Sequence, residues 1–156
     1  MSIFLDARAA DVVTIPVNTE RKSPYVAWAR YQSEAPDLDE LAEWEARYPN
    51  AAAICGTISQ RLLCIDIEGR FVATDRLKEL AQRLTAAEIV DTWTTWVNGY
   101  CETTPSGGLH ILVRLSGDGP MPHNDKLAFD GGGQVVIETR AEARSNGRSF
   151  LAANSE

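Results

Sequence analysis

The sequence has few of the features that mark secreted, membrane or zinc-stabilised proteins. Its 156 residues include only three cysteines, Cys55, Cys64 and Cys101. An odd number without paired short spacings argues against a disulfide framework and a structural zinc site, so we expect a reducing, cytoplasmic setting. No run of about 18 apolar residues is present, which argues against a membrane partner. Residues 1–8 lack a basic region followed by an apolar run, and we expect no secretory signal.

Basic side chains are in the minority. The chain has 22 acidic and 15 basic residues, a formal net charge of −7, which at first argues against nucleic acid as a partner. However, six acids and no base lie between residues 34 and 45. This run has a capping-box pattern at Asp37 and Glu40, and apolar residues at helical spacing from Leu38 to Tyr48. It predicts a capped helix with a solvated acidic face, and a cation-binding or partner-repelling role stays open.

The remaining pattern predicts an α+β fold, with helices concentrated in the first half and antiparallel strands in the second. At 44% hydrophobic, the composition is sufficient for a buried core. Besides the acidic helix, short helices are predicted at 25–31 and 74–84. Strands are predicted at 12–17, 51–55, 61–67, 91–104, 109–115 and 134–139, with the segment 116–129 as a polar loop and 149–153 as a last apolar piece.

Three carboxylates interrupt apolar strands. Asp66 and Glu68 end the strand that begins at residue 62, and positions i and i+2 of a strand point to the same face. Glu138 lies in another apolar strand, where charge is unusual. Two neighbouring carboxylates repel unless a cation neutralises them, and a hard divalent ion suits oxygen ligands. The alternatives are a polar strand edge facing water for the first two and an ion pair with Arg140 for the third.

A glycine turn precedes one of the two histidines. Thr104-Pro105-Ser106-Gly107-Gly108 leads through Leu109 to His110. Successive backbone N–H groups in such a turn can form a nest for an anion, and a serine hydroxyl and an imidazole add donors. We therefore predict anion binding here, although a single histidine on a strand is more often structural. His123, in a proline-containing loop, has no such context and is treated as incidental.

Together these motifs resemble the bifunctional primase–polymerase (prim-pol) branch of the archaeo-eukaryotic primase superfamily. The Thr-Pro-Ser-Gly-Gly-Leu-His segment is the most specific match. The other matches are Lys22-Ser23-Pro24 with Trp28 and Tyr31-Gln32, the block from Asn50 to Glu68, and Val136 to Arg140. The resemblance runs from about residue 12 to about residue 153. The family's glycines are mostly missing from 141–150, where Arg144 and Arg148, like Arg140, are candidates to face template or primer phosphates.

The resemblance implies an RRM-like antiparallel catalytic core with helices on one side and a small N-terminal α/β unit, all within one domain over 1–156. That domain would be the N-terminal part of a larger replication protein from a phage or mobile element. The full-length protein would also contain a helicase domain. Two Mg²⁺ or Mn²⁺ ions would be bound by Asp66, Glu68 and Glu138. The incoming dNTP or NTP would be held by Ser106, Gly107, Gly108, His110 and Arg140, and a single-stranded DNA template and primer would complete the site.

Two other functions stay open at this point. A non-catalytic RRM-like module would bind single-stranded nucleic acid through aromatic stacking, for which Trp93, Trp96 and Tyr100 are candidates that fit core packing more simply. A metal-dependent nuclease would use the same carboxylates without needing a triphosphate-binding turn. If the acidic run and three metal ligands are set aside, thirteen acids remain against fifteen bases. The acidic balance therefore does not exclude DNA as a partner.

Overall fold

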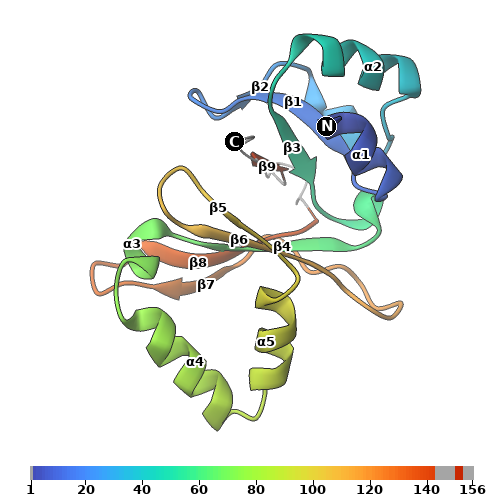
Figure 1. The fold of residues 1–156 in the computed structure, drawn as a ribbon. Helices are drawn as coiled ribbons and strands as arrows, with labels where there is room; N and C mark the ends of the chain where they lie inside the picture. The colour runs from blue at the N-terminus through green and yellow to red at the C-terminus, as the bar shows by residue number, and fades with distance from the viewer. Residues whose placement is uncertain (1, 143–149, 153–156) are drawn as a thin grey trace.

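The computed structural model describes residues 2–142 and 150–152 and contains two antiparallel sheets (Figure 1). The larger sheet has the strand order β5-β6-β4-β8-β7 and the smaller sheet β2-β1-β3-β9. The larger sheet comprises β4 (Leu62–Ile67), β5 (Tyr100–Thr103), β6 (Leu109–Arg114), β7 (Lys126–Phe129) and β8 (Val135–Arg140). The smaller sheet comprises β1 (Thr14–Asn18), β2 (Ser23–Pro24), β3 (Ala51–Ile54) and β9 (Phe150–Ala152). The α+β prediction is confirmed.

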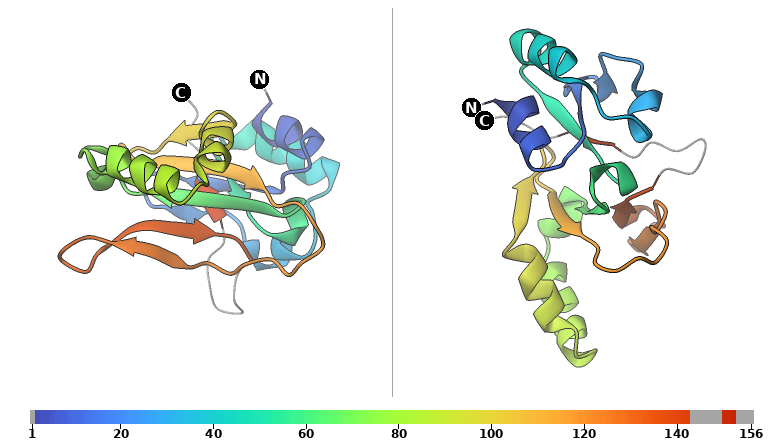
Figure 2. Two further views of the ribbon diagram at one scale, coloured as in Figure 1. Left: turned by 90° about the horizontal axis from the view of Figure 1, so that it is seen from below. Right: turned by 90° about the vertical axis from the view of Figure 1, so that its right-hand side faces the viewer.

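The helices divide between the two sheets. Helices α1 (Ile3–Ala9) and α2 (Leu38–Arg47) lie with the smaller sheet, together with the 3₁₀ helix η1 (Trp28–Gln32). Helices α3 (Gly69–Val72), α4 (Arg76–Ala86) and α5 (Val90–Val97) belong to the larger sheet, and η2 (Thr57–Ser59) joins β3 to β4. The right-hand view of Figure 2 shows α2 and the α4–α5 pair at opposite ends of the molecule. Within the described residues, none of these helices has the length and apolar character needed to span a bilayer.

The acidic run forms α2 as predicted, and Asp37, Glu40 and Glu43 have partners on this helix or shortly before it. Asp37 and Glu40 make the capping box, and Glu40 also pairs with Arg30. Glu43 pairs with Arg47 one turn later, at 2.6 Å. The buried face is shorter than the spacing predicts, because Leu38 is 66% exposed and burial begins at Leu41. These contacts favour the interpretation of a capped, solvated helix.

The segment 91–104 differs from its prediction as one long strand. Residues 90–97 form α5, and only Tyr100–Thr103 form a strand. Trp93, Trp96 and Val97 pack against the apolar face of the larger sheet. Their spacing of three to four residues places them on one side of a helix, so packing overrides the strand preference of Thr, Val and Trp. Other elements, among them α1, β2, α3 and β7, lie in segments where the sequence pattern predicted no helix or strand.

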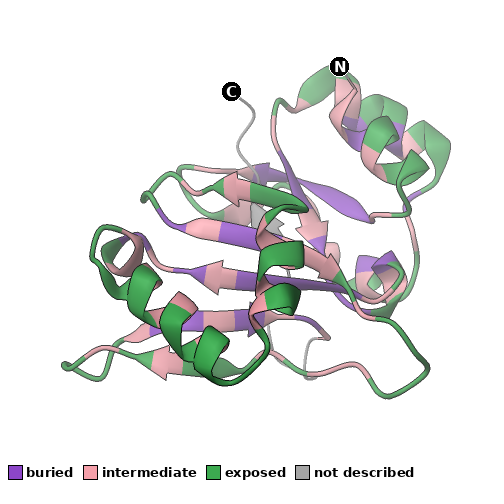
Figure 3. Ribbon diagram, turned by 60° about the horizontal axis from the view of Figure 1, so that its bottom comes forward, coloured by how far each residue is buried: buried purple, intermediate pink, exposed green. Residues whose placement is uncertain are grey.

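Three apolar clusters hold the fold together. One lies between the smaller sheet and its helices, around Phe4, Ile15 and Ile54. A second lies between the larger sheet and α3–α5, around residues such as Ile67 and Ile111. A third, made of Cys55, Leu62 and Cys64 with partly buried neighbours, joins β3 to the opposite face of the larger sheet. Figure 3 shows that burial concentrates on the strands, while α4 and α5 carry no buried residue.

Candidate functional site

A row of polar side chains crosses the larger sheet. In the strand register, Asp66 on β4 is opposite His110 on β6 and opposite Glu138 on β8. At the two edges, Glu102 on β5 is opposite His110, and Lys126 on β7 is opposite Glu138. Directly opposed residues of antiparallel strands lie on the same face. We call these five residues the cross-strand row.

The row lies on the face of the sheet that α4 and α5 do not cover. Ile65 and Ile67 flank Asp66 and pack into the cluster beneath those helices, so Asp66 must point the other way. Cys64, two residues before Asp66, contacts the cluster that reaches β3. Figure 1 accordingly shows α4 and α5 on one side of the larger sheet and the smaller sheet on the other. The row therefore faces the smaller sheet.

The centre of the row is a partly buried network of charged groups. The side chain of His110 is 10% exposed, and its Nε2 lies 3.6 Å from Oδ1 of Asp66. The guanidinium of Arg140 lies 3.5 Å from Oδ2 of Asp66 and also pairs with Glu138. Arg140 thus supplies the positive charge between two carboxylates that would otherwise repel each other. The structure brings together four of the predicted site residues, Asp66, His110, Glu138 and Arg140.

Glu68 lies apart from this centre. Strand β4 ends at Ile67, and Glu68 is the residue before α3, with its N–H donating to the carbonyl of Val136 at 3.0 Å. Its side chain is 39% exposed and lies 3.9 Å from Arg70. Across the chain described by the structure, no three His, Cys, Asp or Glu side chains form a group that could hold a metal ion. The three-carboxylate ligand set therefore stays a prediction.

The glycine turn packs directly against the start of α3. A Cβ on Gly69 would lie 2.0 Å from the carbonyl oxygen of Ser106, and a Cβ on Gly108 would lie 2.3 Å from that of Ile67. Such approaches are possible only without a side chain. The turn is closed by Thr104, whose hydroxyl accepts from the N–H of Gly108 and whose carbonyl accepts from that of Gly107, both at 2.9 Å. These two N–H groups are already bonded, so the exposed Ser106 hydroxyl, 3.1 Å from that of Thr104, is the turn's outward polar group.

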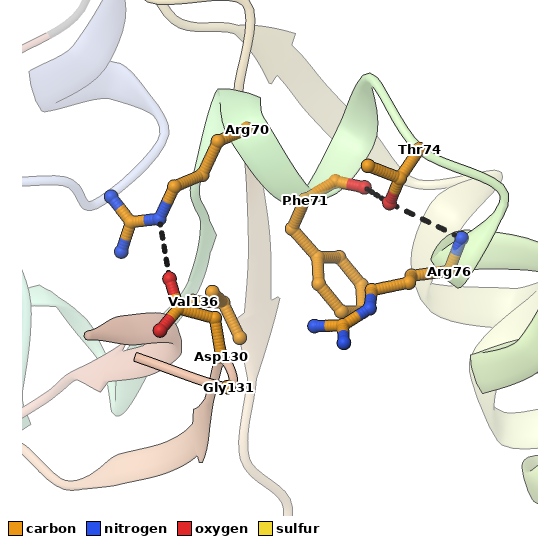
Figure 4. Close-up of a pocket in the computed structure, with 7 residues that line it drawn as sticks. All are labelled: Arg70, Phe71, Thr74, Arg76, Asp130, Gly131 and Val136. Atoms are coloured by element: carbon orange, nitrogen blue, oxygen red, sulfur yellow. Dashed lines mark hydrogen bonds and ion pairs between the residues drawn. The ribbon is translucent and has the colours of Figure 1, made fainter. Parts of the chain in front are cut away.

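A pocket of about 260 Å³ lies beyond Glu68, between α3, the start of α4 and the β7–β8 turn (Figure 4). Arg70 and Arg76 bring two positive charges to it. Arg70 is held by Asp130, with 3.4 Å between Nε and Oδ2, and donates to the carbonyl of Val135. A hydrogen bond from the N–H of Gln134 is the main cause of the lowered pKa of Asp130, which therefore stays anionic beside Arg70.

The sequence interpretation did not identify Glu102, Arg70 or Asp130 as site residues. Glu102 had a detectable signal, because the predicted hairpin around the Pro-Ser-Gly-Gly turn pairs it with His110. The pairing of Arg70 with Asp130 joins segments sixty residues apart and has no local signal. Arg144 and Arg148, predicted to face phosphates, lie outside the described residues.

The fold and the row define an α+β protein with a charged site on the face of an antiparallel sheet that α4 and α5 do not cover. Residues 5–156 match the family model described as bifunctional DNA primase/polymerase, N-terminal, and the chain belongs to that family. No curated protein matches the chain. The family assignment predicted from the sequence motifs is thereby confirmed.

Proposed function

We propose that the chain is a nucleotidyltransferase that synthesises primers and extends DNA on a single-stranded template. The observation that carries this proposal is the opposed pair of Asp66 and Glu138, with His110 in the same row, in a chain of the prim-pol family. Rigid strands hold such groups more accurately than loops do. Phosphoryl transfer requires mainly this kind of positioning and charge stabilisation.

The chemistry of the acidic residues fits a hard divalent cation. Asp66, Glu68 and Glu138 would hold two Mg²⁺ or Mn²⁺ ions, since carboxylate oxygens are the ligands these ions prefer. When bound, such ions activate the attacking 3′-hydroxyl and stabilise the pyrophosphate that leaves. In this structure the guanidinium of Arg140 neutralises part of the negative charge of Asp66 and Glu138. If a bound metal ion neutralised these carboxylates instead, the guanidinium would be available to the nucleotide phosphates.

The nucleotide would be held on the turn side of the row. Ser106, Gly107 and Gly108 lie against the backbone that follows Glu68, so a triphosphate bound by this turn would lie next to the carboxylates. The hydroxyl of Ser106, the imidazole of His110 and the guanidinium of Arg140 are the donors we assign to the triphosphate. The backbone of Gly107 and Gly108 would allow the triphosphate to approach closely.

The pocket beyond Glu68 suits a second polyanion. Arg70 and Arg76 present guanidinium groups that match phosphate geometry, and we assign them to the DNA backbone of template or primer. In the full protein this unit would work beside a helicase domain in the cytoplasm of a bacterial host or in a phage replication complex.

Nucleotide incorporation by the purified chain tests the proposal. The chain is incubated with Mg²⁺ or Mn²⁺, a single-stranded DNA template and labelled nucleotides, with and without a primer. We expect product growth by the wild type and its loss in Asp66→Asn, Glu68→Gln and Glu138→Gln. Glu79→Gln, on the exposed face of α4, is the matched control, because among the described residues its carboxylate pairs with Arg83 on the same helix. Circular dichroism and thermal unfolding establish that each variant is folded.

The products separate this function from its alternatives. Growth that depends on the three carboxylates supports nucleotidyl transfer. Shortening of the template, lost in the same variants, would show a nuclease instead. Binding of single-stranded DNA without any change in its length, equal in wild type and variants, would show a non-catalytic module.

A further inference from the structure

The strongest unexplained feature of the row is Glu102, an acid on the edge strand β5. It lies directly opposite His110, and its Oε1 is 2.8 Å from the Nδ1 of that imidazole. Both side chains are largely covered, at 10% exposed for His110 and 18% for Glu102. A charged group placed in this way needs a partner, and the nucleotidyl-transfer chemistry proposed above does not use it.

The carboxylate of Glu102 is fixed at both oxygens. While Oε1 faces His110, Oε2 accepts a hydrogen bond from the hydroxyl of Tyr100 at 3.1 Å. Tyr100 lies two residues earlier on β5, on the same face of the strand. Burial and the charge of Glu102 raise the pKa of Tyr100, so its hydroxyl keeps the hydrogen it donates. The edge strand therefore presents a carboxylate whose orientation is set before any ligand arrives.

This contact determines how the imidazole is oriented. An ionised carboxylate can only accept hydrogen bonds, so the Nδ1 of His110 must carry the hydrogen between them. Holding Nδ1 at the sheet edge directs Nε2 to the centre of the row, where it lies 3.6 Å from Asp66. A hydrogen bond that the ring N–H donates to a carboxylate commonly fixes the ring orientation and tautomer of a functional histidine.

We infer that Glu102 is the positioning residue of His110: it holds Nδ1–H and places Nε2 at the centre of the row, where a protonated imidazole can donate to the bound triphosphate. The identity of the ligand as a triphosphate rests on the proposed function. The orientation of the ring rests only on the contacts described above. The carboxylate of Glu102 contacts the imidazole of His110 and the hydroxyl of Tyr100, so we place its effect on the nucleotide through His110.

Nuclear magnetic resonance of the imidazole nitrogens tests the orientation without any activity. The chain has only two histidines, and His123 is exposed and serves as an internal reference. In metal-free protein at a pH where both rings are neutral, long-range ¹H–¹⁵N spectra should show hydrogen on Nδ1 of His110. Glu102→Ala should lose this single tautomer. Glu102→Gln should keep it, because its amide oxygen still accepts from Nδ1–H. A spectrum of His110 unchanged in Glu102→Ala would overturn the inference.

Nucleotide kinetics then test the consequence. Glu102→Ala should raise the KM for the incoming nucleotide about tenfold, in the direction of His110→Ala, while Glu102→Gln should restore most of the affinity. Tyr100→Phe should produce a smaller rise, and Glu79→Ala none. A wild-type KM in folded Glu102→Ala would contradict the inference. If the wild-type chain incorporates no nucleotide, the proposed function fails, and the tautomer measurement still decides the role of Glu102.

Discussion

Gly69 and Gly108 allow the turn before His110 to lie against the backbone that follows Glu68. A Cβ at Gly69 would be 2.0 Å from a backbone oxygen of the turn, and backbone atoms cannot move aside as a flexible side chain can. Gly69→Ala should therefore push the turn away from Glu68. We expect folded protein destabilised by about 1–3 kcal/mol and a rise in nucleotide KM, measured by denaturant unfolding and by incorporation.

Gly119→Ala is the control, because a Cβ there would meet no atom of the described residues within 4 Å. Its stability should stay within about 0.5 kcal/mol of the wild type. Gly108→Ala should behave like Gly69→Ala, because Gly108 lies on the turn side of the contact between the turn and β4–α3. Its Cβ would lie too close to the carbonyl oxygen of Ile67. Wild-type stability and KM in both variants would show that the turn does not depend on this close approach.

At the residue scale, the sequence pattern singled out residues that the fold places opposite one another on neighbouring strands. Asp66 and Glu138 are anomalous in apolar strands, and a strand of period two must place such a residue on the face opposite its apolar neighbours. Their alignment across β4 and β8 depends on strand order and register, which are long-range properties. Arg140 pairs with both acids because of that register. A local sequence pattern could not predict the pair with Asp66. The pair with Glu138, two residues away on the same strand, was one of the alternatives considered from the sequence.

At the element scale, α1 shows why a short helix escapes a local pattern. The N-terminus of α1 has no side-chain cap from its own N-cap residue. Glu45, forty residues later on α2, accepts from the N–H groups of Ile3 and Phe4 and from the Ser2 hydroxyl, at 2.9–3.1 Å. A helix capped from a distant segment has no capping signal beside it. The edge strand β7 also lacks a clear sequence pattern, because it has only four residues and its pairing with β8 is irregular.

Glu45→Gln should weaken α1 in a pH-dependent way. Burial acts to raise the pKa of Glu45, but the hydrogen bonds from Phe4, Ser2 and Ile3 outweigh it, and the pKa is lowered. A carboxyl with a lowered pKa in the folded state stabilises the protein above its unfolded pKa, and this contribution is lost as pH falls through the folded value. We expect a loss of about 1 kcal/mol at neutral pH, which disappears in acid, measured by denaturant unfolding from pH 7 to pH 3.

Glu43→Gln on the same helix is the matched control. Its carboxylate is exposed and, in the part of the chain that the structure describes, pairs with Arg47 one turn away, a kind of pair that contributes about 0.5 kcal/mol or less. Equal stability of Glu43→Gln and Glu45→Gln at neutral pH would contradict the role of Glu45 as a cap.

At the scale of the whole molecule, the two sheets are joined at the segment that links β3 to β4. The hydroxyl of Ser59 accepts from the N–H of Val13 at 2.9 Å and donates to the carbonyl of Ile54 at 2.6 Å. The carbonyl of Ser59 accepts from Arg114 of β6 at 3.1 Å, and Arg114 also donates to the carbonyl of Ala10. The smaller sheet, the linking segment and the larger sheet are thus joined by one set of hydrogen bonds. The apolar contacts of Cys55 and Cys64 join the same parts of the molecule.

This junction leads us to expect that the chain unfolds as one unit, as the prediction of a single domain over 1–156 requires. Ser59 is fully buried, and Ser59→Ala would leave the N–H of Val13 without its partner. An unpaired buried donor costs about 1–3 kcal/mol, and the loss should shift one cooperative transition that fluorescence and circular dichroism report together. Ser33→Ala, which removes an exposed hydroxyl bonded to Arg30, should change stability by less than about 0.5 kcal/mol. Two separate transitions in the wild type, or a Ser59→Ala variant as stable as Ser33→Ala, would mean that the two sheets are stable independently of this junction.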